Sequence, residues 1–140
     1  FFFSKNQVVM KLNWKGSLTH SIDEGCIEGY ITKPKQEEQL ENYLKKHGYD
    51  EYVSFIKEKY ENLAILTNLY IEENHRGNGF GSFLVHDFIY KAKRNGADAI
   101  LLVADTGESN DFDLVEWYEN YGFEIVAGEI DHYPLMTLTC

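Results

Sequence analysis

The stretch from Leu66 to Arg94 constrains the fold most, because it reads as a strand, a glycine turn and a helix in direct succession. Residues 66–71 are mostly β-favouring types and predict a strand. Its two faces should carry Leu66, Asn68 and Tyr70 on one side and Thr67, Leu69 and Ile71 on the other. Apolar residues then recur every three or four positions, at Phe80, Phe83, Leu84, Phe88 and Ala92. This spacing predicts an amphipathic helix, which Asn95-Gly96 would end.

The turn between strand and helix reads Arg76-Gly77-Asn78-Gly79-Phe80-Gly81. Glycines let a backbone approach a ligand closely and turn its N–H groups outward. A helix N-terminus adds unpaired donors and a partial positive charge. We therefore expect a phosphate-binding site here, although a plain tight turn needs only one glycine.

Two nucleotide-binding patterns compete with this interpretation of the turn. A dinucleotide fingerprint would need glycine where Ser82 stands, and the chain is short for two mononucleotide-binding halves. Asp105 does follow the next apolar strand, roughly where a ribose-binding acid would be expected. The nucleoside-triphosphate loop G-x-x-x-x-G-K-[ST] is absent from the sequence.

Two motifs in order carry a resemblance to a known family. Arg76-x-x-Gly79-x-Gly81, after a β-favouring stretch, resembles the acyl-CoA-binding motif of the GNAT superfamily of N-acetyltransferases. Residues 117–124, which read W-Y-E-N-Y-G-F-E, resemble the aromatic signature that follows the CoA strand in that family. The resemblance implies one domain over residues 1–140, with a mixed α/β fold. About six or seven strands would form a twisted sheet flanked by about four helices, with two central strands splayed apart.

The resemblance also implies roles for individual residues. Backbone groups of Leu69, Tyr70 and Ile71 would face the pantetheine arm of acetyl-CoA. The pyrophosphate would lie on Arg76, Gly77, Asn78, Gly79, Phe80, Gly81 and Ser82. Asn110 or Asp111 would help to hold the CoA arm, and Tyr118 would be the general acid. Acetyl-CoA or CoA would be the cosubstrate, with no metal.

The chemistry of acyl transfer to an amine agrees with these residue types. It needs a positioned thioester, a stabilised oxyanion, a neutral amine and a proton for the leaving thiolate. A phenol such as Tyr118 can supply that proton, although a core position is the plainer interpretation. No carboxylate stands on the strand that ends at Ile71, so the base is open. Glu28 is one candidate; the others are His20, Asp131, His132 and a water chain.

We therefore expect an N-acetyltransferase that moves an acetyl group from acetyl-CoA to a primary amine by direct attack in a ternary complex. A non-catalytic acyl-CoA-binding or sensing module is the first alternative. A small nucleotide-binding protein is the second.

The remaining segments predict further strands and helices. Strands are expected at residues 8–14, 26–31 and 99–104, and an antiparallel pair at 123–127 and 135–139. The unbroken apolar run at 99–104 should be a parallel neighbour of the central strand. Helices are expected at 36–47 and 50–60, as cover for one sheet face or a lid, and after candidate N-caps Asn110 and Asp111. Residues 21–25 read as a polar loop.

The net charge of −10 limits the partners. It argues against nucleic acid and favours a small-molecule or peptide amine that is cationic before reaction, although solubility alone could explain it. The acidic residues cluster at Asp23/Glu24/Glu28, Glu37/Glu38/Glu41 and Glu129/Asp131. Two cysteines give no disulfide framework or metal spacing. No leader pattern or membrane-length apolar run stands out, so we expect a cytoplasmic protein away from membranes, with a homodimer allowed.

Overall fold

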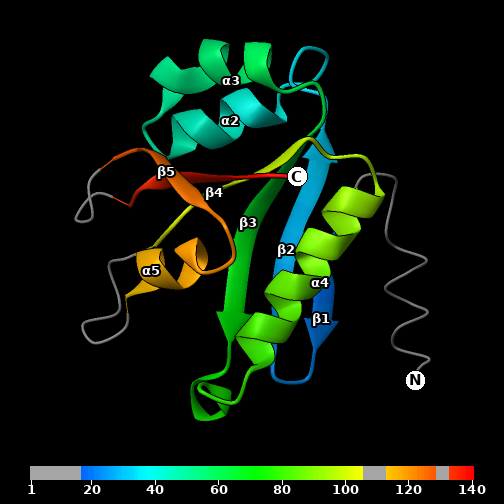
Figure 1. The fold of residues 1–140 in the computed structure, drawn as a ribbon, viewed down its shortest axis with the longest axis vertical. Helices are drawn as coiled ribbons and strands as arrows, with labels where there is room; N and C mark the ends of the chain where they lie inside the picture. Colours follow the sequence, from blue (N-terminus) through cyan, green and yellow to red (C-terminus); the bar gives the residue numbers. More distant parts are fainter. Residues whose placement is uncertain (1–16, 106–112, 129–132) are drawn as a thin grey trace.

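A mixed sheet forms the centre of the molecule (Figure 1). The computed structural model describes residues 17–105, 113–128 and 133–140. Within them the strands are β1 (His20–Ile22), β2 (Gly25–Thr32), β3 (Leu63–Ile71), β4 (Ala99–Val103), β5 (Glu124–Ala127) and β6 (Leu135–Thr139). The α-helices are α2 (Gln39–Lys46), α3 (Val53–Lys59), α4 (Phe80–Arg94) and α5 (Leu114–Glu119). Short 3-10 turns cover Asp50–Tyr52 and Glu73–His75. The expected mixed α/β fold is confirmed.

The strand order is β1-β2-β3-β4-β6-β5. β3 and β4 are parallel and are joined through α4, whereas each other described neighbour pair is antiparallel. The expected parallel neighbour and the closing antiparallel pair are therefore confirmed. A sheet with one parallel pair is not the doubly wound sheet of a dinucleotide-binding domain, which needs several in succession.

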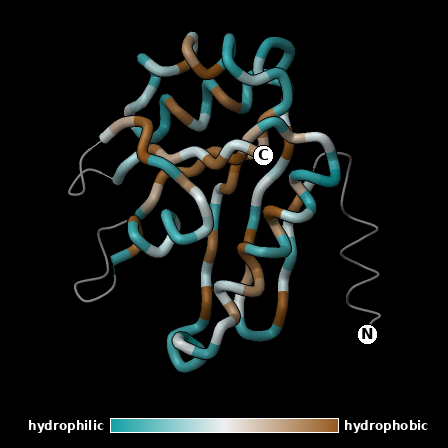
Figure 2. Tube along the Cα trace, viewed as in Figure 1, coloured by the Kyte–Doolittle hydropathy of each residue, from teal (hydrophilic) through white to brown (hydrophobic). Residues whose placement is uncertain are grey.

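Two apolar layers enclose the sheet. α4 and α5 pack on one face around Phe88 and Val115, and α2 and α3 pack on the other around Leu44 and Ile56. β4 contributes to both layers, which explains its unbroken apolar sequence. Apolar residues accordingly concentrate along the central strands in Figure 2. The helices predicted at 36–47 and 50–60 do cover one sheet face.

A β-bulge in β3 changes the predicted alternation. Glu28 pairs with Asn68 and the next residue, Gly29, pairs with Leu66, so Thr67 is an extra residue on β3. Because the bulge inserts one extra residue into β3, the side chains beyond it point to the opposite face from the one that strict alternation predicts. Leu66 and Leu69 therefore both pack against the α4 layer, and strict two-residue alternation along β3 was wrong.

Several predicted boundaries also differ from the structure. Residues 21–25 are not simply a loop, because β1 pairs with β2 in a hairpin. Phe83 is 52% exposed rather than on the buried face of α4; Val85 takes that place. The helix predicted at 50–60 begins as a 3-10 turn. The N-cap of α5 is Asp113, whose carboxylate accepts from the Glu116 amide at 3.0 Å. The strand expected at 8–14 lies outside the described residues.

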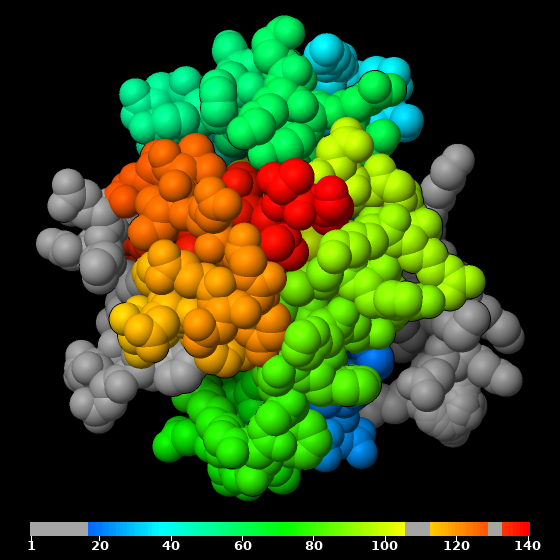
Figure 3. All heavy atoms as spheres, viewed as in Figure 1, coloured from blue at the N-terminus to red at the C-terminus, as the bar shows by residue number. Residues whose placement is uncertain are grey.

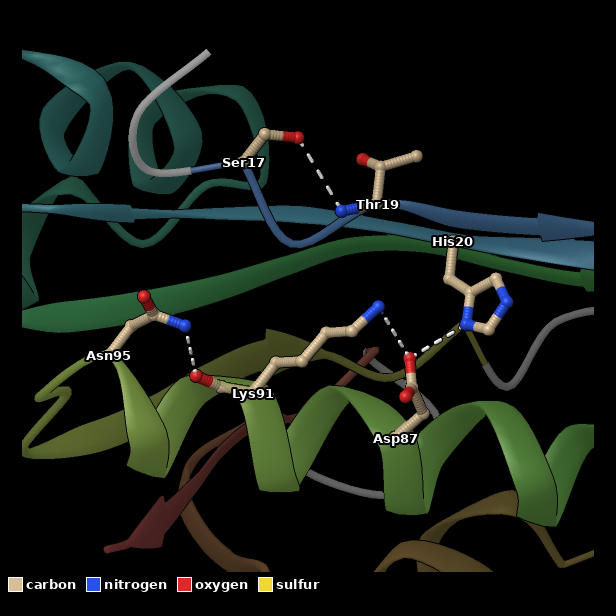
Figure 4. A network of polar contacts seen from close by, with 6 residues as sticks. All are labelled: Ser17, Thr19, His20, Asp87, Lys91 and Asn95. Atoms are coloured by element: carbon tan, nitrogen blue, oxygen red, sulfur yellow. Dashed lines mark hydrogen bonds and ion pairs between the residues drawn. The ribbon is translucent and has the colours of Figure 1, made fainter. Parts of the chain in front are cut away.

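A polar network holds the edge strand β1 against α4 (Figure 4). His20 Nδ1 and Asp87 Oδ2 are 2.7 Å apart, and Lys91 Nζ lies 3.0 Å from the same oxygen. Burial acts to raise the pKa of the Asp87 carboxyl, but the hydrogen bonds from His20 and Lys91 outweigh it and lower that pKa. The network therefore fixes the sheet edge farthest from β4.

Candidate active site

The glycine turn before α4 is open at its surface. Gly77 has a φ of 83° and Gly79 a φ of 86°, in the left-handed region that disfavours side chains. A Cβ added at either residue would meet nothing within 4 Å. Gly79 is also the N-cap of α4. Because it has no side chain, the first amides of the helix receive no side-chain cap from it. The first amides of this helix therefore fit a phosphate, which would complete their hydrogen bonding.

Arg76 is held at the rim of this turn. Its Nε donates to the carbonyl of Ile71 at 2.9 Å, and its guanidinium carbon lies 5.9 Å from the Tyr70 ring centroid. The Nε bond leaves the donors of both Nη atoms for other partners. Asn78 is anchored too, because its amide donates to the His75 carbonyl at 3.3 Å. The turn thus presents a fixed cation beside the helix N-terminus.

Helix α5 packs against the start of α4 (Figure 3). A Cβ at Gly81 would lie 3.5 Å from the Trp117 ring, so this glycine faces α5 rather than open space. The Tyr121 hydroxyl donates to Ser82 Oγ at 2.8 Å. The Cα of the last glycine of the predicted motif therefore faces the Trp117 ring at a distance that a Cβ would fill in ordinary contact, and its amide is the part that could face a ligand.

β3 and β4 diverge a short way along their length. Their pairing ends at Ile65 with Leu101, although β3 continues to Ile71. We call this divergence the fork. Tyr43 of α2 stands at its base: its hydroxyl donates to the Leu66 carbonyl at 3.4 Å and accepts from the Val103 amide at 2.9 Å. The fork opens toward the end of β3 that carries the glycine turn.

Tyr118 of α5 is part of the core on the α4 side. It is 5% exposed, and its ring lies 5.1 Å from that of Trp117 and 5.5 Å from that of Phe123. Burial raises the pKa of its phenol, and the nearby hydroxyl of Tyr43 raises it further. The two phenols therefore belong to the apolar layers on opposite faces of the sheet, and both keep their protons at neutral pH.

Glu28 lies on the face of the sheet that α2 and α3 cover in part. Tyr30, two residues further along β2, packs against that helical layer, so Glu28 shares its face. The Glu28 carboxylate accepts from the Asn68 amide at 3.0 Å, and both side chains are exposed. A carboxylate from β2 and an amide from β3 thus meet beside the bulge, near the fork.

The other predicted residues fall in different places. Leu69, Tyr70 and Ile71 form the end of β3 that is not paired with β4. His20 is bound to Asp87 on the α4 side and lies on the face opposite Glu28. Asn110, Asp111, Asp131 and His132 lie outside the described residues.

Tyr43 falls within the helix predicted at 36–47, which the sequence pattern predicts as cover or a lid and to which it assigns no chemistry. Its hydroxyl is the feature of the sequence that could have indicated a structural role. A tyrosine at an inward helix position normally requires a hydrogen-bond partner, which leucine or phenylalanine would not. The partners are contributed by two strands distant in sequence, so they could not be identified from helix spacing.

The described residues contain neither a metal-binding cluster nor a membrane-spanning helix. No group of three His, Cys, Asp or Glu side chains there is placed to hold a metal ion. None of the helices in the same part of the chain is long and apolar enough to cross a bilayer.

The profile of a family described as an acetyltransferase (GNAT) domain matches residues 22–125. No curated protein sequence matches the chain.

Solved structures resemble it at low identity. An acetyltransferase from Bacillus cereus is 17% identical, with a TM-score of 0.56 over 99% of this chain and 89% of its own. The NatC complex bound to Gag peptide and CoA is 18% identical, with a TM-score of 0.57 over 88% and 71%. An Arabidopsis thaliana protein in complex with the bisubstrate analogue CoA-Ac-MVNAL is 18% identical, with a TM-score of 0.55 over 88% and 73%. At such identities these likenesses establish the fold.

Proposed function

We propose, because the chain belongs to the GNAT acetyltransferase family, that it transfers an acetyl group from acetyl-CoA to a primary amine by direct attack in a ternary complex. One observation carries the proposal. The open glycine turn at the start of α4 and the fork lie at the two ends of the stretch of β3 that pairs with β2 but not with β4. A ligand with a pyrophosphate and a long arm fits this pair of features. Solved structures with the same fold that contain CoA or a CoA analogue support the assignment.

The residues of the turn would bind the pyrophosphate. Amides of Gly79 to Ser82 and the Arg76 guanidinium would neutralise its charge. Backbone groups of Leu69, Tyr70 and Ile71 would hold the arm, because β4 does not use them. Bound acetyl-CoA supplies the thioester that donates the acetyl group.

Tyr118 would provide the proton that the leaving thiolate needs. Its raised pKa keeps the hydroxyl protonated across the pH range of an assay. Burial makes this phenol a weaker acid, but the same apolar surroundings would raise the pKa of the leaving thiol as well, so proton transfer to the thiolate stays feasible. The core position and the catalytic role are therefore compatible.

Glu28 would accept the proton of the attacking amine, directly or through water. Its hydrogen bond with Asn68 fixes the carboxylate on the sheet face opposite α4, in the part that α2 and α3 do not cover. The acceptor would then approach from the face opposite α4, while the CoA phosphates bind at the α4 end. This separation allows both substrates to bind together.

We also propose that the acceptor is cationic before reaction, such as a polyamine or the amine of a basic peptide. Asp23, Glu24 and Glu28 lie in or beside the β1–β2 hairpin, and the chain carries ten excess negative charges. The kcat/KM for cationic amines should fall as salt rises, because ions screen the attraction. A neutral amine preferred equally at low and high salt would contradict this.

Gly79→Val tests the cofactor site, with Gly96→Val as its matched control. Both glycines have nearly the same positive φ, 86° and 85°, both face open space, and they stand at opposite ends of α4. Strain should thus destabilise both variants similarly, but only valine at 79 would fill the phosphate position. We expect calorimetry to show CoA affinity reduced at least about tenfold in Gly79→Val and unchanged in Gly96→Val.

Equal CoA affinity in the two variants would overturn the site assignment. Tight acetyl-CoA binding by the wild type without thiol release, across a panel of primary amines, would instead indicate a non-catalytic acyl-CoA-binding module.

A further inference from the structure

The base of the fork has an unusual backbone arrangement. In a parallel ladder that continued past Ile65 and Leu101, the Val103 amide would donate to the Leu66 carbonyl. The Tyr43 hydroxyl stands between these two groups, donating to one and accepting from the other. A side-chain hydroxyl thus replaces the first missing backbone bond between β3 and β4.

The sheet holds this hydroxyl firmly. Tyr43 is 8% exposed and its ring belongs to the core layer formed with Leu40 and Leu44. Burial raises the pKa of Tyr43 to about 12, so the hydroxyl stays protonated. Since its proton is directed to the Leu66 carbonyl, this phenol is not placed as the acid of the reaction. Its hydroxyl stands between the two strands at the point where their pairing ends.

Tyr43 lies at the end of the fork that the arm of a bound acyl-CoA would approach. The glycine turn follows the carboxyl end of β3, and the fork narrows toward its amino end. An arm anchored by its pyrophosphate at the turn therefore carries its thioester toward Tyr43.

We propose that Tyr43 is a positioning residue that ends the fork, fixes where the thioester stops and limits the acyl group to a short chain. This inference rests on the proposed function. It assigns Tyr43 no contact with the reacting atoms, and it predicts separate consequences for removing the hydroxyl and for removing the ring.

The hydroxyl is tested without any substrate. In Tyr43→Phe the ring remains but the Val103 amide loses its acceptor. Hydrogen exchange followed by NMR should show the Val103 amide exchanging at least about tenfold faster, with the Leu101 amide unchanged inside the ladder. Unchanged exchange at Val103 would overturn the proposal.

The hydroxyl is tested again in turnover. With acetyl-CoA, Tyr43→Phe should lower kcat about tenfold while KM for acetyl-CoA stays within about twofold, because the anchor at the turn is intact and the thioester is misplaced. Tyr49→Phe is the matched control, since Tyr49 is also 8% exposed and donates to the Tyr133 carbonyl, at 2.8 Å. Its kcat should match the wild type.

The ring is tested by acyl chain length. In Tyr43→Ala, the ratio of kcat/KM for butyryl-CoA to that for acetyl-CoA should rise about tenfold or more over the wild type, because added methylenes gain space. Tyr49→Ala should not change this ratio. An unchanged ratio in folded Tyr43→Ala would overturn the proposal, and if that variant does not fold, the Tyr43→Phe measurements decide alone.

Measurements on the wild type distinguish a failure of the Tyr43 positioning role from a failure of the proposed function. If it binds acetyl-CoA and acetylates an amine while the Tyr43 variants behave like their controls, only the positioning role fails. If it binds no acyl-CoA at all, the proposed function fails and this inference fails with it.

Discussion

The glycine turn and the fork differ in how the chain builds them. The turn is made by contiguous residues, 76–82, whose shape depends on two positive-φ glycines and a helix start. The fork is assembled from Tyr43 of α2, Leu66 of β3 and Val103 of β4. A ligand could be recognised by local geometry at the turn, whereas the fork exists only once the whole sheet has formed. Binding and chemistry should therefore respond separately to mutation.

The largest difference between the effect on kcat and the effect on CoA affinity is expected at Tyr118. Tyr118→Phe should lower kcat by about 100-fold or more with CoA affinity nearly intact, because it removes the proton donor and retains the ring. Steady-state kinetics and calorimetry on the same preparation check this. A lowered melting temperature with wild-type kcat would show that Tyr118 serves the core alone.

At Arg76 we expect the opposite result, a loss of CoA affinity with little change in kcat. Arg76→Ala should weaken CoA binding by about 1.5–3 kcal/mol, the loss of charge-assisted bonds, while kcat at saturating acetyl-CoA stays near the wild-type value. Arg94→Ala is a matched control at the other end of α4. Arg94 stacks on Tyr90 at 6.0 Å much as Arg76 stacks on Tyr70 at 5.9 Å. Equal CoA affinity in both variants would remove Arg76 from the site.

A smaller effect on the acceptor side is expected at Glu28. Glu28→Gln keeps an oxygen for Asn68 but cannot take a proton, so kcat/KM for the amine should fall about tenfold near neutral pH and recover as rising pH deprotonates the amine. Glu38→Gln changes the net charge equally at another exposed position and should have little effect. Parallel pH profiles for the two variants would assign the proton acceptor elsewhere.

The last effect concerns stability at high pH rather than binding or turnover. The folded pKa values of Tyr43 and Tyr118 lie above the unfolded value of about 10 because the phenols are buried. Their contribution to stability is present below pH 10 and is lost as pH rises through the folded values. The free energy of unfolding should fall by roughly 1–3 kcal/mol between pH 10 and pH 12. Denaturant titrations should show a shallower fall in Tyr43→Phe, and an identical slope would mean that Tyr43 titrates normally.

The same contrast explains what the sequence could predict. The strand, the turn and α4 were predictable because glycine conformation and helix periodicity are local properties. The parallel position of β4 followed from its apolar run, which needs burial on both faces.

The bulge at Thr67 and the bridge at Tyr43 depend on register between strands. Alternation along β3 alone predicted the wrong faces beyond Leu66, because one extra residue reverses every later side chain. At Gly81, the motif named the residue but did not predict that it faces the Trp117 ring of α5. The sequence thus named candidate residues, but it did not give the contacts that organise them.

The most direct test of the central claim is whether one ligand reaches both the turn and the fork. Backbone amide shifts can be mapped by NMR with CoA and with adenosine diphosphate, which carries a pyrophosphate without the pantetheine arm. Adenosine diphosphate should shift amides of Gly77 to Ser82 only, and CoA should shift these together with the Val103 amide. CoA shifts confined to the turn, or found away from both features, would contradict a single site that joins them.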